Sequence, residues 1–474
     1  MSSESESRPA AGGSSALRQS SGQAGSGQGF VFNVNSVFIS TVLAYGISFL
    51  AAVLLARVLG PEGRGVTALY QQAVGFGFAL ASLGIASAIV YFVARRDLTS
   101  REALESGLSV TIAATALTAA IVGIAALLAG ESIHAAAGPY WLAVLTVPAI
   151  IQFRLVEGCL RAQERFGAMN VLEVLLTLAA LVGFVLVELT IGLTVGRAIA
   201  VWSASFLPPT VLGYVLLGTS ALPRRLPSFT TLRPTVRFGF EAQLGNLLQA
   251  LNYRLDSYLV LAFVNTAGVG LYAVGVQLSE GMWFIANSVA VVFQTNLTAR
   301  DDEYAARNAP IVCRNTILVT ALAAIAAGAV SPFVVPLVFG SDFDDAVLPF
   351  VLLLPGTVAL AGTKILAAYV FSRGRPLINA VIAFAALVVT VVADLILIPL
   401  LEVEGAAIGA SLGYTLSLAL TVMAFRALSG GSIADALLPR PADAALYVDA
   451  VRSLAARLPL TRRPAGPDAS GRRP

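Results

Sequence analysis

The chain has 474 residues, of which 57% are apolar and 12% charged. Soluble domains carry about 25% charged residues, and no soluble fold buries this much apolar surface. The net charge of +3 is small and the basic residues form no continuous patch, so neither a soluble enzyme nor a nucleic-acid partner fits the composition. An integral membrane protein is predicted.

The N-terminal half begins with a Ser/Gly/Gln-rich segment, 1–29, which lacks the features of a signal peptide and is expected to be a disordered cytoplasmic tail. Apolar runs of about 20 residues follow, the length that crosses the ~30 Å hydrocarbon core. They predict a six-helix lobe over 30–218, with helices near 33–57, 66–93, 104–129, 139–160, 168–188 and 196–218.

The C-terminal half follows a Pro- and Arg-rich cytoplasmic linker at 219–236. A second six-helix lobe is predicted over 237–428, with helices near 237–264, 268–297, 310–338, 346–371, 376–400 and 405–427. The Arg/Pro/Ala-rich segment 429–474 is expected to be a cytoplasmic tail with at most a short surface helix near 442–457. The fold class is therefore all-α, with about twelve transmembrane helices.

The two halves form a weak internal repeat. A shift of about 205 positions places Gly65 on Gly270 and Gln72 on Gln277 without a gap. Six helices return the chain to the same side, so the pattern predicts parallel repeats about an axis along the membrane normal. This arrangement is typical of transporters whose substrate lies between the halves.

Arginine placement predicts the orientation. Arginines occupy alternate breaks, which are therefore cytoplasmic, and both termini are then inside a cytoplasmic membrane. Arg57, Arg64 and Arg197 depart from this rule in predicted outside loops.

Polar stripes run along the predicted seventh and eighth helices, where an ionisable residue costs about 2.5–3.5 kcal/mol at the helix centre. Their spacing of three and four places them on one face of each helix. A matching stripe in the predicted second helix begins at Gln72. Together with the single lysine, these stripes give the predicted cavity and substrate-binding residues: Arg254, Asp256, Glu280, Lys364, Asn246, Gln249, Tyr253, Gln277, Asn287 and Gln72.

A charged layer is one arrangement of these residues, because Arg254, Asp256, Glu280 and Asp394 lie at similar depths along their helices. The alternative is that Arg254 pairs with Glu280 only to hold two helices together. A local ion pair is sufficient to explain Arg154, Glu157 and Glu173.

Catalytic and metal-binding motifs are missing from the sequence: no Walker loop, zinc-type His/Glu cluster or Ser/His/Asp set stands at usable spacing. Cys159 and Cys313 fit no metal motif, and His134, the one histidine, stands in a predicted outside loop. We therefore expect no catalytic residues, no metal and no cofactor.

Three short segments carry a resemblance to a known family. They are the run from Ala56 to Gly65 (ARVLGPEGRG), Arg254-Leu255-Asp256, and the run from Arg373 to Pro376 (RGRP). In these segments the chain resembles polysaccharide-biosynthesis flippases, over about residues 30–428. These flippases belong to the superfamily that includes multidrug and toxic compound extrusion transporters and lipid II flippases.

The resemblance implies a two-lobed fold whose V-shaped cavity alternates between the membrane faces. It implies transfer of a polyprenyl-diphosphate-linked oligosaccharide to the outer leaflet, commonly driven by an ion gradient or membrane potential. The expected partners are this substrate, membrane lipids and the glycosyltransferases or polymerase of the same pathway. Arg254 or Lys364 would suit the diphosphate, and Tyr253 and Trp283 would suit the sugars.

Two other functions stay open at this stage. One is an ion-coupled drug or small-molecule antiporter of the same superfamily. The other is a membrane-embedded glycosyltransferase or polymerase, which the short predicted outside loops disfavour.

Overall fold

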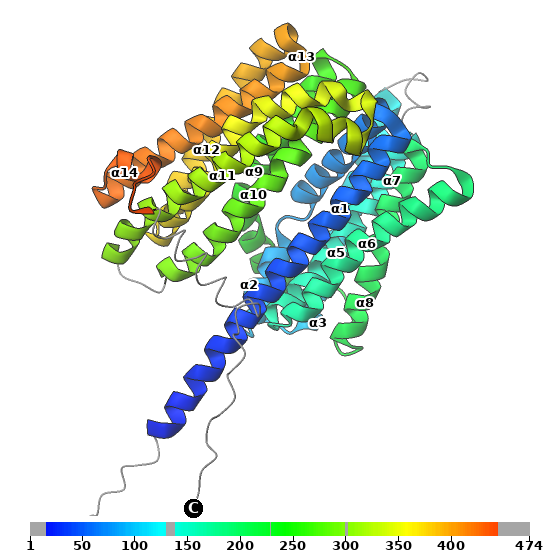
Figure 1. Ribbon diagram of the computed structural model, residues 1–474. Coiled ribbons are helices and arrows are strands. Elements are labelled where there is room, and N and C mark those ends of the chain that lie inside the picture. The colour runs from blue at the N-terminus through cyan, green and yellow to red at the C-terminus, as the bar shows by residue number, and fades with distance from the viewer. Residues whose placement is uncertain (1–15, 129–137, 228, 299–301, 444–474) are drawn as a thin grey trace, which may run out of the picture. The chain divides into compact units, whose positions relative to one another are not determined.

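A computed structural model describes residues 16–128, 138–227, 229–298 and 302–443, shown in Figure 1. Helices make up most of these residues, and no strand occurs among them. The first helix begins at Ala16, inside the segment 1–29 for which a tail is expected. His134 and most of the surface helix expected near 442–457 lie outside the described residues.

Seven α-helices and one 3₁₀ helix make up the first half: α1 (Ala16–Ala81), α2 (Ile85–Ala94), α3 (Ser100–Leu128), η1 (Gly138–Leu142), α5 (Ala143–Ala162), α6 (Phe166–Ile191), α7 (Val195–Ala204) and α8 (Leu207–Leu217). The second half contains α9 (Phe229–Phe263), α10 (Thr266–Thr298), α11 (Asp302–Phe339), η2 (Ser341–Ala346), α12 (Val347–Ser372), α13 (Pro376–Ser429) and α14 (Ile433–Leu437).

Within the described part of the chain, nine segments are long and apolar enough to cross a membrane. Two of them, in α1 and α13, contain a residue with non-helical backbone, Gly60 and Glu402 respectively. The chain reverses its direction at Glu402. The evidence is that residues on the two sides of Glu402 are in contact: a Cβ placed on Gly409 would lie 2.0 Å from the side chain of Asp394.

A reversal also occurs in α1, since Ser48 and Gln71 line the same cavity although a straight helix would hold them about 34 Å apart. With each reversal counted as two helices and the 35-residue α9 added, the described chain has twelve. The predicted all-α fold of about twelve helices is confirmed.

Two predicted helices are interrupted. The helix expected at 66–93 breaks at Leu83 and Gly84, both of which have positive φ. The close approach of α9 requires the glycine, because a Cβ on Gly84 would lie 2.0 Å from the carbonyl oxygen of Gly239. The helix expected at 196–218 divides into α7 and α8 just before Pro208 and Pro209, which cannot donate backbone hydrogen bonds.

The chain divides into two compact units. Unit 1 comprises 1–278, 330–353 and 387–410, and unit 2 comprises 279–329, 354–386 and 411–474. The borders cut through α10 to α13, so the units do not follow the predicted lobes 30–218 and 237–428, and that division of the chain stays a prediction.

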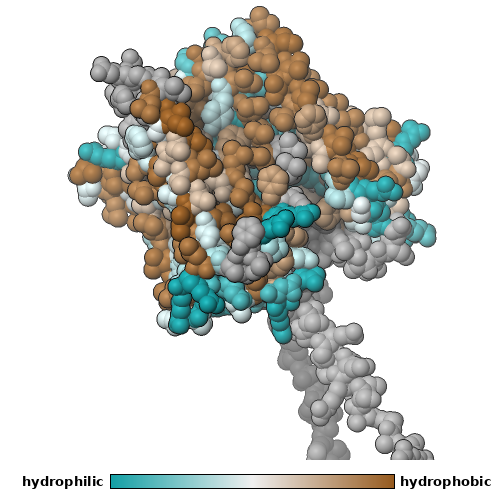
Figure 2. Space-filling view, turned by 180° about the vertical axis from the view of Figure 1, so that it is seen from behind, coloured by the Kyte–Doolittle hydropathy of each residue, from teal (hydrophilic) through white to brown (hydrophobic). Residues whose placement is uncertain are grey.

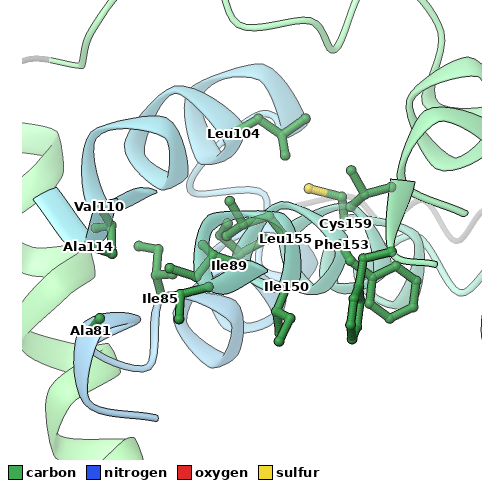
Figure 3. Close-up of a cluster of buried hydrophobic side chains, with 14 of the residues drawn as sticks. Ala81, Ile85, Ile89, Leu104, Val110, Ala114, Ile150, Phe153, Leu155 and Cys159 are labelled. Carbon is green, nitrogen blue, oxygen red and sulfur yellow. The ribbon is translucent and has the colours of Figure 1, made fainter. Parts of the chain in front are cut away.

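The core of unit 1 lies among α2, α3 and α5 (Figure 3). Ile85 and Ile89 of α2 and Phe153 and Leu155 of α5 are fully buried there. The helix α1 packs along α5 and α6, as Figure 1 shows. A second cluster in unit 1 joins Ala56 of α1 to residues of α10, α11 and η2.

The core of unit 2 is formed by α10 to α13, which pack around buried side chains such as Tyr369 and Phe425. The ring centroids of these two residues are 5.0 Å apart. The segment after α13 packs against this core, since Ile433 and Leu437 of α14 contact it. A bidentate ion pair between Arg314 of α11 and Asp443 fastens the end of the segment, with N to O distances of 2.6 and 2.5 Å. The start of the predicted C-terminal tail is therefore a docked element.

Apolar side chains cover much of the surface. Figure 2 shows them over most of the visible face, with hydrophilic residues in separate patches along its lower part and at its side edges. Leu127, Leu189 and Phe333 are each more than three-quarters exposed, at 84%, 77% and 79%. Such a surface is stable only against lipid, which agrees with the membrane-spanning helices.

Candidate functional site

Two glutamines at equivalent repeat positions connect the halves within unit 1. The side-chain amide of Gln72 on α1 donates to the hydroxyl of Ser257 on α9 at 3.2 Å. The backbone carbonyl of Gln277 on α10 accepts from the hydroxyl of Tyr45 on α1 at 2.8 Å. Each glutamine thus contacts the first helix of the other half, as expected for a two-fold related repeat.

A cavity of about 340 Å³ lies among α1, α5, α6, α7 and the part of α10 that belongs to unit 1. Its lining includes two arginines and an indole ring: Ser48, Arg64, Gln71, Arg154, Trp202 and Gln277. Unlike the predicted stripes of α9 and α10, this cavity is formed mainly by the first half of the chain.

Arg64 is the buried cation of this cavity, with 7% of its surface exposed. Its Nη2 lies 3.4 Å from the side-chain oxygen of Gln277, a weak hydrogen bond, and Nε and Nη1 have no hydrogen-bond partner among the described residues. The charge of Arg254 acts on Arg64 as well. The sequence prediction placed Arg64 in an outside loop and missed it, although its departure from the positive-inside rule was the available signal.

The second arginine of the cavity, Arg154, is already paired. Its Nη1 donates to Glu157 and Glu173 at 2.6 Å each. Arg161 donates to the other oxygen of Glu157. This network confirms the local ion pair expected from the sequence. Arg64 is then the arginine of the lining that has no carboxylate partner among the described residues.

Two buried carboxylates lie near each other elsewhere in unit 1. Asp256 is 3% exposed and accepts hydrogen bonds from the hydroxyl of Tyr272 and, at 2.8 Å, from the backbone N–H of Ser257. Asp394 is fully buried, and neither of its carboxylate oxygens has a hydrogen-bond partner among the described residues. The two carboxylates interact electrostatically. A buried pair of this kind requires a proton or a bound cation, because two like charges out of water repel strongly.

In unit 2, side chains of α10, α12 and α13 form a site in which a cation lies on an aromatic ring. The Nζ of Lys364 lies 5.1 Å from the ring centroid of Trp283, and the charge of Glu280 acts on the amine. Tyr414 packs edge-on against the same indole at 6.4 Å. Glu280 and Lys364 were both predicted from the sequence as cavity residues, and the structure brings them together.

The remaining predicted residues fall in several places. Tyr253 and Arg254 are half-buried on α9, and Asn287 is exposed on α10. The side chains of Asn246 and Gln249 lie outside the described part of the chain. Arg254 belongs to unit 1 and Glu280 to unit 2, so both their pairing and the four-residue charged layer stay predictions. In the described residues, no group of three His, Cys, Asp or Glu side chains is arranged to hold a metal.

Comparison with known proteins identifies the sequence family. Residues 30–296, more than half of the chain, match the family described as "Polysaccharide biosynthesis protein". A search of curated proteins gave no match.

Solved structures identify the fold. An inward-facing multidrug resistance MATE family transporter of the MOP superfamily aligns over 84% of this chain and 99% of its own, with a TM-score of 0.69 and 16% identity. The lipid II flippase MurJ, in an inward closed conformation, aligns over 83% of this chain and 89% of its own, with a TM-score of 0.67 and 11% identity. A MOP superfamily transporter from Pyrococcus furiosus, described as having a binding pocket of reverse polarity, aligns over 84% and 95% with a TM-score of 0.57 and 16% identity. At these identities the likeness shows the two-lobed exporter fold.

Proposed function

We propose, from the premise that this chain belongs to the polysaccharide biosynthesis protein family, that it is a membrane flippase. Its substrate is a polyprenyl-diphosphate-linked oligosaccharide, a precursor of a cell-surface polysaccharide. It moves this lipid across the cytoplasmic membrane by alternating access, with both termini in the cytoplasm. The glycosyltransferases or polymerase of the same pathway are its functional partners.

The observation that carries the proposal is Lys364 above the ring of Trp283. An amine held at an indole face can recognise both parts of a glycolipid headgroup. The cation attracts the diphosphate, and the aromatic face packs on the sugar rings. Glu280 and Tyr414 border the same place and supply a hydrogen-bond acceptor and a hydroxyl. The arrangement suits a ligand that is anionic and rich in hydroxyls.

The carboxylates of Asp256 and Asp394 support ion coupling. A cation, either H⁺ or Na⁺, that neutralises this pair in one conformation and leaves it in the other would tie transport to an electrochemical gradient. The unsatisfied oxygens of Asp394 are the reason to place the exchange there.

The competing function is export of a cationic drug by antiport. The similarity in fold to a MATE transporter and the buried acidic pair favour it. A membrane-embedded glycosyltransferase or polymerase has less support, since the proteins of similar fold are transporters and a flippase.

Translocation in proteoliposomes distinguishes these functions. A fluorescent polyprenyl-diphosphate oligosaccharide is placed in one leaflet, and its transfer is followed with wild type, Lys364→Ala and Arg254→Ala at equal reconstitution. Arg96→Ala, which removes one exposed arginine, is the matched control. We expect transfer by wild type and the control, and its loss in Lys364→Ala. If wild type fails under every imposed gradient and exports a cationic dye instead, the antiporter function replaces the proposal.

A further inference from the structure

We infer that the cavity around Arg64 in unit 1 is a binding site for an oxyanion, and that Arg64 is the residue that selects for it. The inference deepens the proposed function, on which it rests only for the source of the oxyanion. A phosphate of the lipid carrier and a carboxylate of an acidic sugar present the same chemistry to a guanidinium.

The argument begins with the charge of Arg64. A guanidinium is always protonated in proteins, and burying it without a counter-ion costs several kcal/mol. Two of its three nitrogens have no hydrogen-bond partner in the described chain, and the third has only the long contact to Gln277. The charge of Arg254 increases the unfavourable energy. Arg64 is therefore a buried cation without an anionic partner among the described residues.

The cavity that Arg64 lines provides space for an anion. The cavity of about 340 Å³ that Arg64 lines has room for a phosphate or carboxylate together with part of a sugar ring. Trp202 contributes an indole to the lining, and Ser48, Gln71 and Thr177 contribute hydrogen-bonding groups. Glu157 and Glu173, the carboxylates at the other arginine of the lining, are bound to Arg154.

The backbone around Arg64 explains why the side chain stays there. Gly60 has a φ of 67° at the reversal of α1, and Gly63 and Gly65 flank the arginine. A Cβ on Gly63 would come within 2.6 Å of the Leu59 side chain, and one on Gly65 within 1.9 Å of the Thr266 carbonyl oxygen. This tight packing fixes the start of the second arm of α1 and keeps the guanidinium buried.

Equilibrium binding of radiolabelled inorganic pyrophosphate and of a labelled hexuronate to the full-length protein in detergent tests the inference. Wild type is compared with Arg64→Gln, Arg64→Lys and the control Arg96→Gln, which removes the same charge from an exposed loop position. We expect at least about tenfold weaker binding by Arg64→Gln, partial recovery by Arg64→Lys, and no change in the control. The probe that binds more tightly identifies the source of the oxyanion.

A second variant covers the case in which Arg64→Gln does not fold. Ser48 is exposed and lines the cavity, so Ser48→Phe fills it and leaves Arg64 in place. It is expected to weaken binding of the same probe by a similar factor. The inference is overturned if wild type binds neither probe more tightly than about 10 mM, or if folded Arg64→Gln or Ser48→Phe binds as wild type does. Binding without translocation in vesicles would count against the proposed function alone, and translocation without binding against this site alone.

Discussion

Gly65 of α1 and Gly270 of α10 occupy equivalent places in the two halves, and each packs against the backbone shortly before the other in the chain. A Cβ on Gly65 would lie 1.9 Å from the carbonyl oxygen of Thr266, and one on Gly270 would lie 1.9 Å from that of Pro61. Thr266 follows Pro61 by the same 205 positions that separate the two glycines. The contact is reciprocal, as expected when a two-fold axis passes through it.

Substitution of either glycine by alanine is therefore predicted to destabilise the protein. The obstructing atoms are backbone, which cannot rotate away, so the cost is about 1–3 kcal/mol or more for each variant. Thermal unfolding in detergent measures it. Gly75→Ala, at a helical site with no atom within 4 Å of the added Cβ, is the control and is expected to be neutral or slightly stabilising. Equal melting temperatures for Gly65→Ala and wild type would show that α1 and α10 do not pack this closely.

Asp394→Asn is predicted to stop ion-coupled transport without lowering the stability of the protein. The amide removes a buried charge that has no hydrogen-bond partner in the described chain, so the melting temperature is expected to stay the same or to rise. Transport driven by an imposed H⁺ or Na⁺ gradient is expected to stop. Asp97→Asn, which removes an exposed carboxylate that pairs with Arg95, serves as the control. Unchanged gradient dependence in Asp394→Asn would exclude this carboxylate from coupling.

Trp283→Leu is predicted to weaken glycolipid binding without unfolding unit 2. Loss of the ring beneath the Lys364 amine removes a cation–π interaction worth about 0.5–2 kcal/mol, which corresponds to about two- to thirtyfold in affinity if the ligand contacts the amine as it lies on the ring. Titration of the labelled glycolipid into protein in detergent measures the change. Trp141→Leu, at a half-exposed position in η1, is the control. If both leucine variants bind alike, the indole of Trp283 does not contribute to the site.

The number of helices and the internal repeat could be predicted from the sequence. Both follow from local patterns: the hydropathy of each segment and the positions of small residues within it. Gly65 and Gly270 align without knowledge of the fold, and the structure shows that they meet. Breaks such as that at Leu83 could not be predicted, since it depends on α9 approaching Gly84 from far along the chain.

The candidate site was predicted in part. Lys364 and Glu280 could be predicted because a charged side chain in an apolar helix has an unfavourable free energy wherever that helix packs. Arg64 lies near a chain reversal, where an arginine ordinarily faces water, and its burial depends on tertiary packing that includes Gln277 of α10. The pairing of Arg314 with a residue of the presumed tail was also missed, since no local pattern connects positions so far apart.

The ion pair between Arg314 and Asp443 gives the last prediction, which concerns acid. The Arg314 guanidinium and the backbone N–H of Arg440 hold the pKa of the Asp443 carboxyl well below its usual range. A depressed carboxyl pKa adds stability that is fully present above the unfolded value of about 3.9 and is lost as the pH falls through the lower folded value. Docking of residues 433–443 is thus expected to be independent of pH from neutrality to about pH 5, and to fail only in stronger acid.

Asp443→Asn is predicted to reproduce that failure at neutral pH. It leaves Arg314, which is 7% exposed, buried without its counter-ion, at a cost of about 3–5 kcal/mol. Hydrogen exchange at the amides of α14 reports the undocking directly. The matched variant Asp435→Asn breaks a more exposed pair with Arg440 in the same segment and is expected to cost at most about 1 kcal/mol. If the two variants exchange equally fast, the buried pair does not hold the segment, and the apolar contacts of Ile433 and Leu437 must dock it alone.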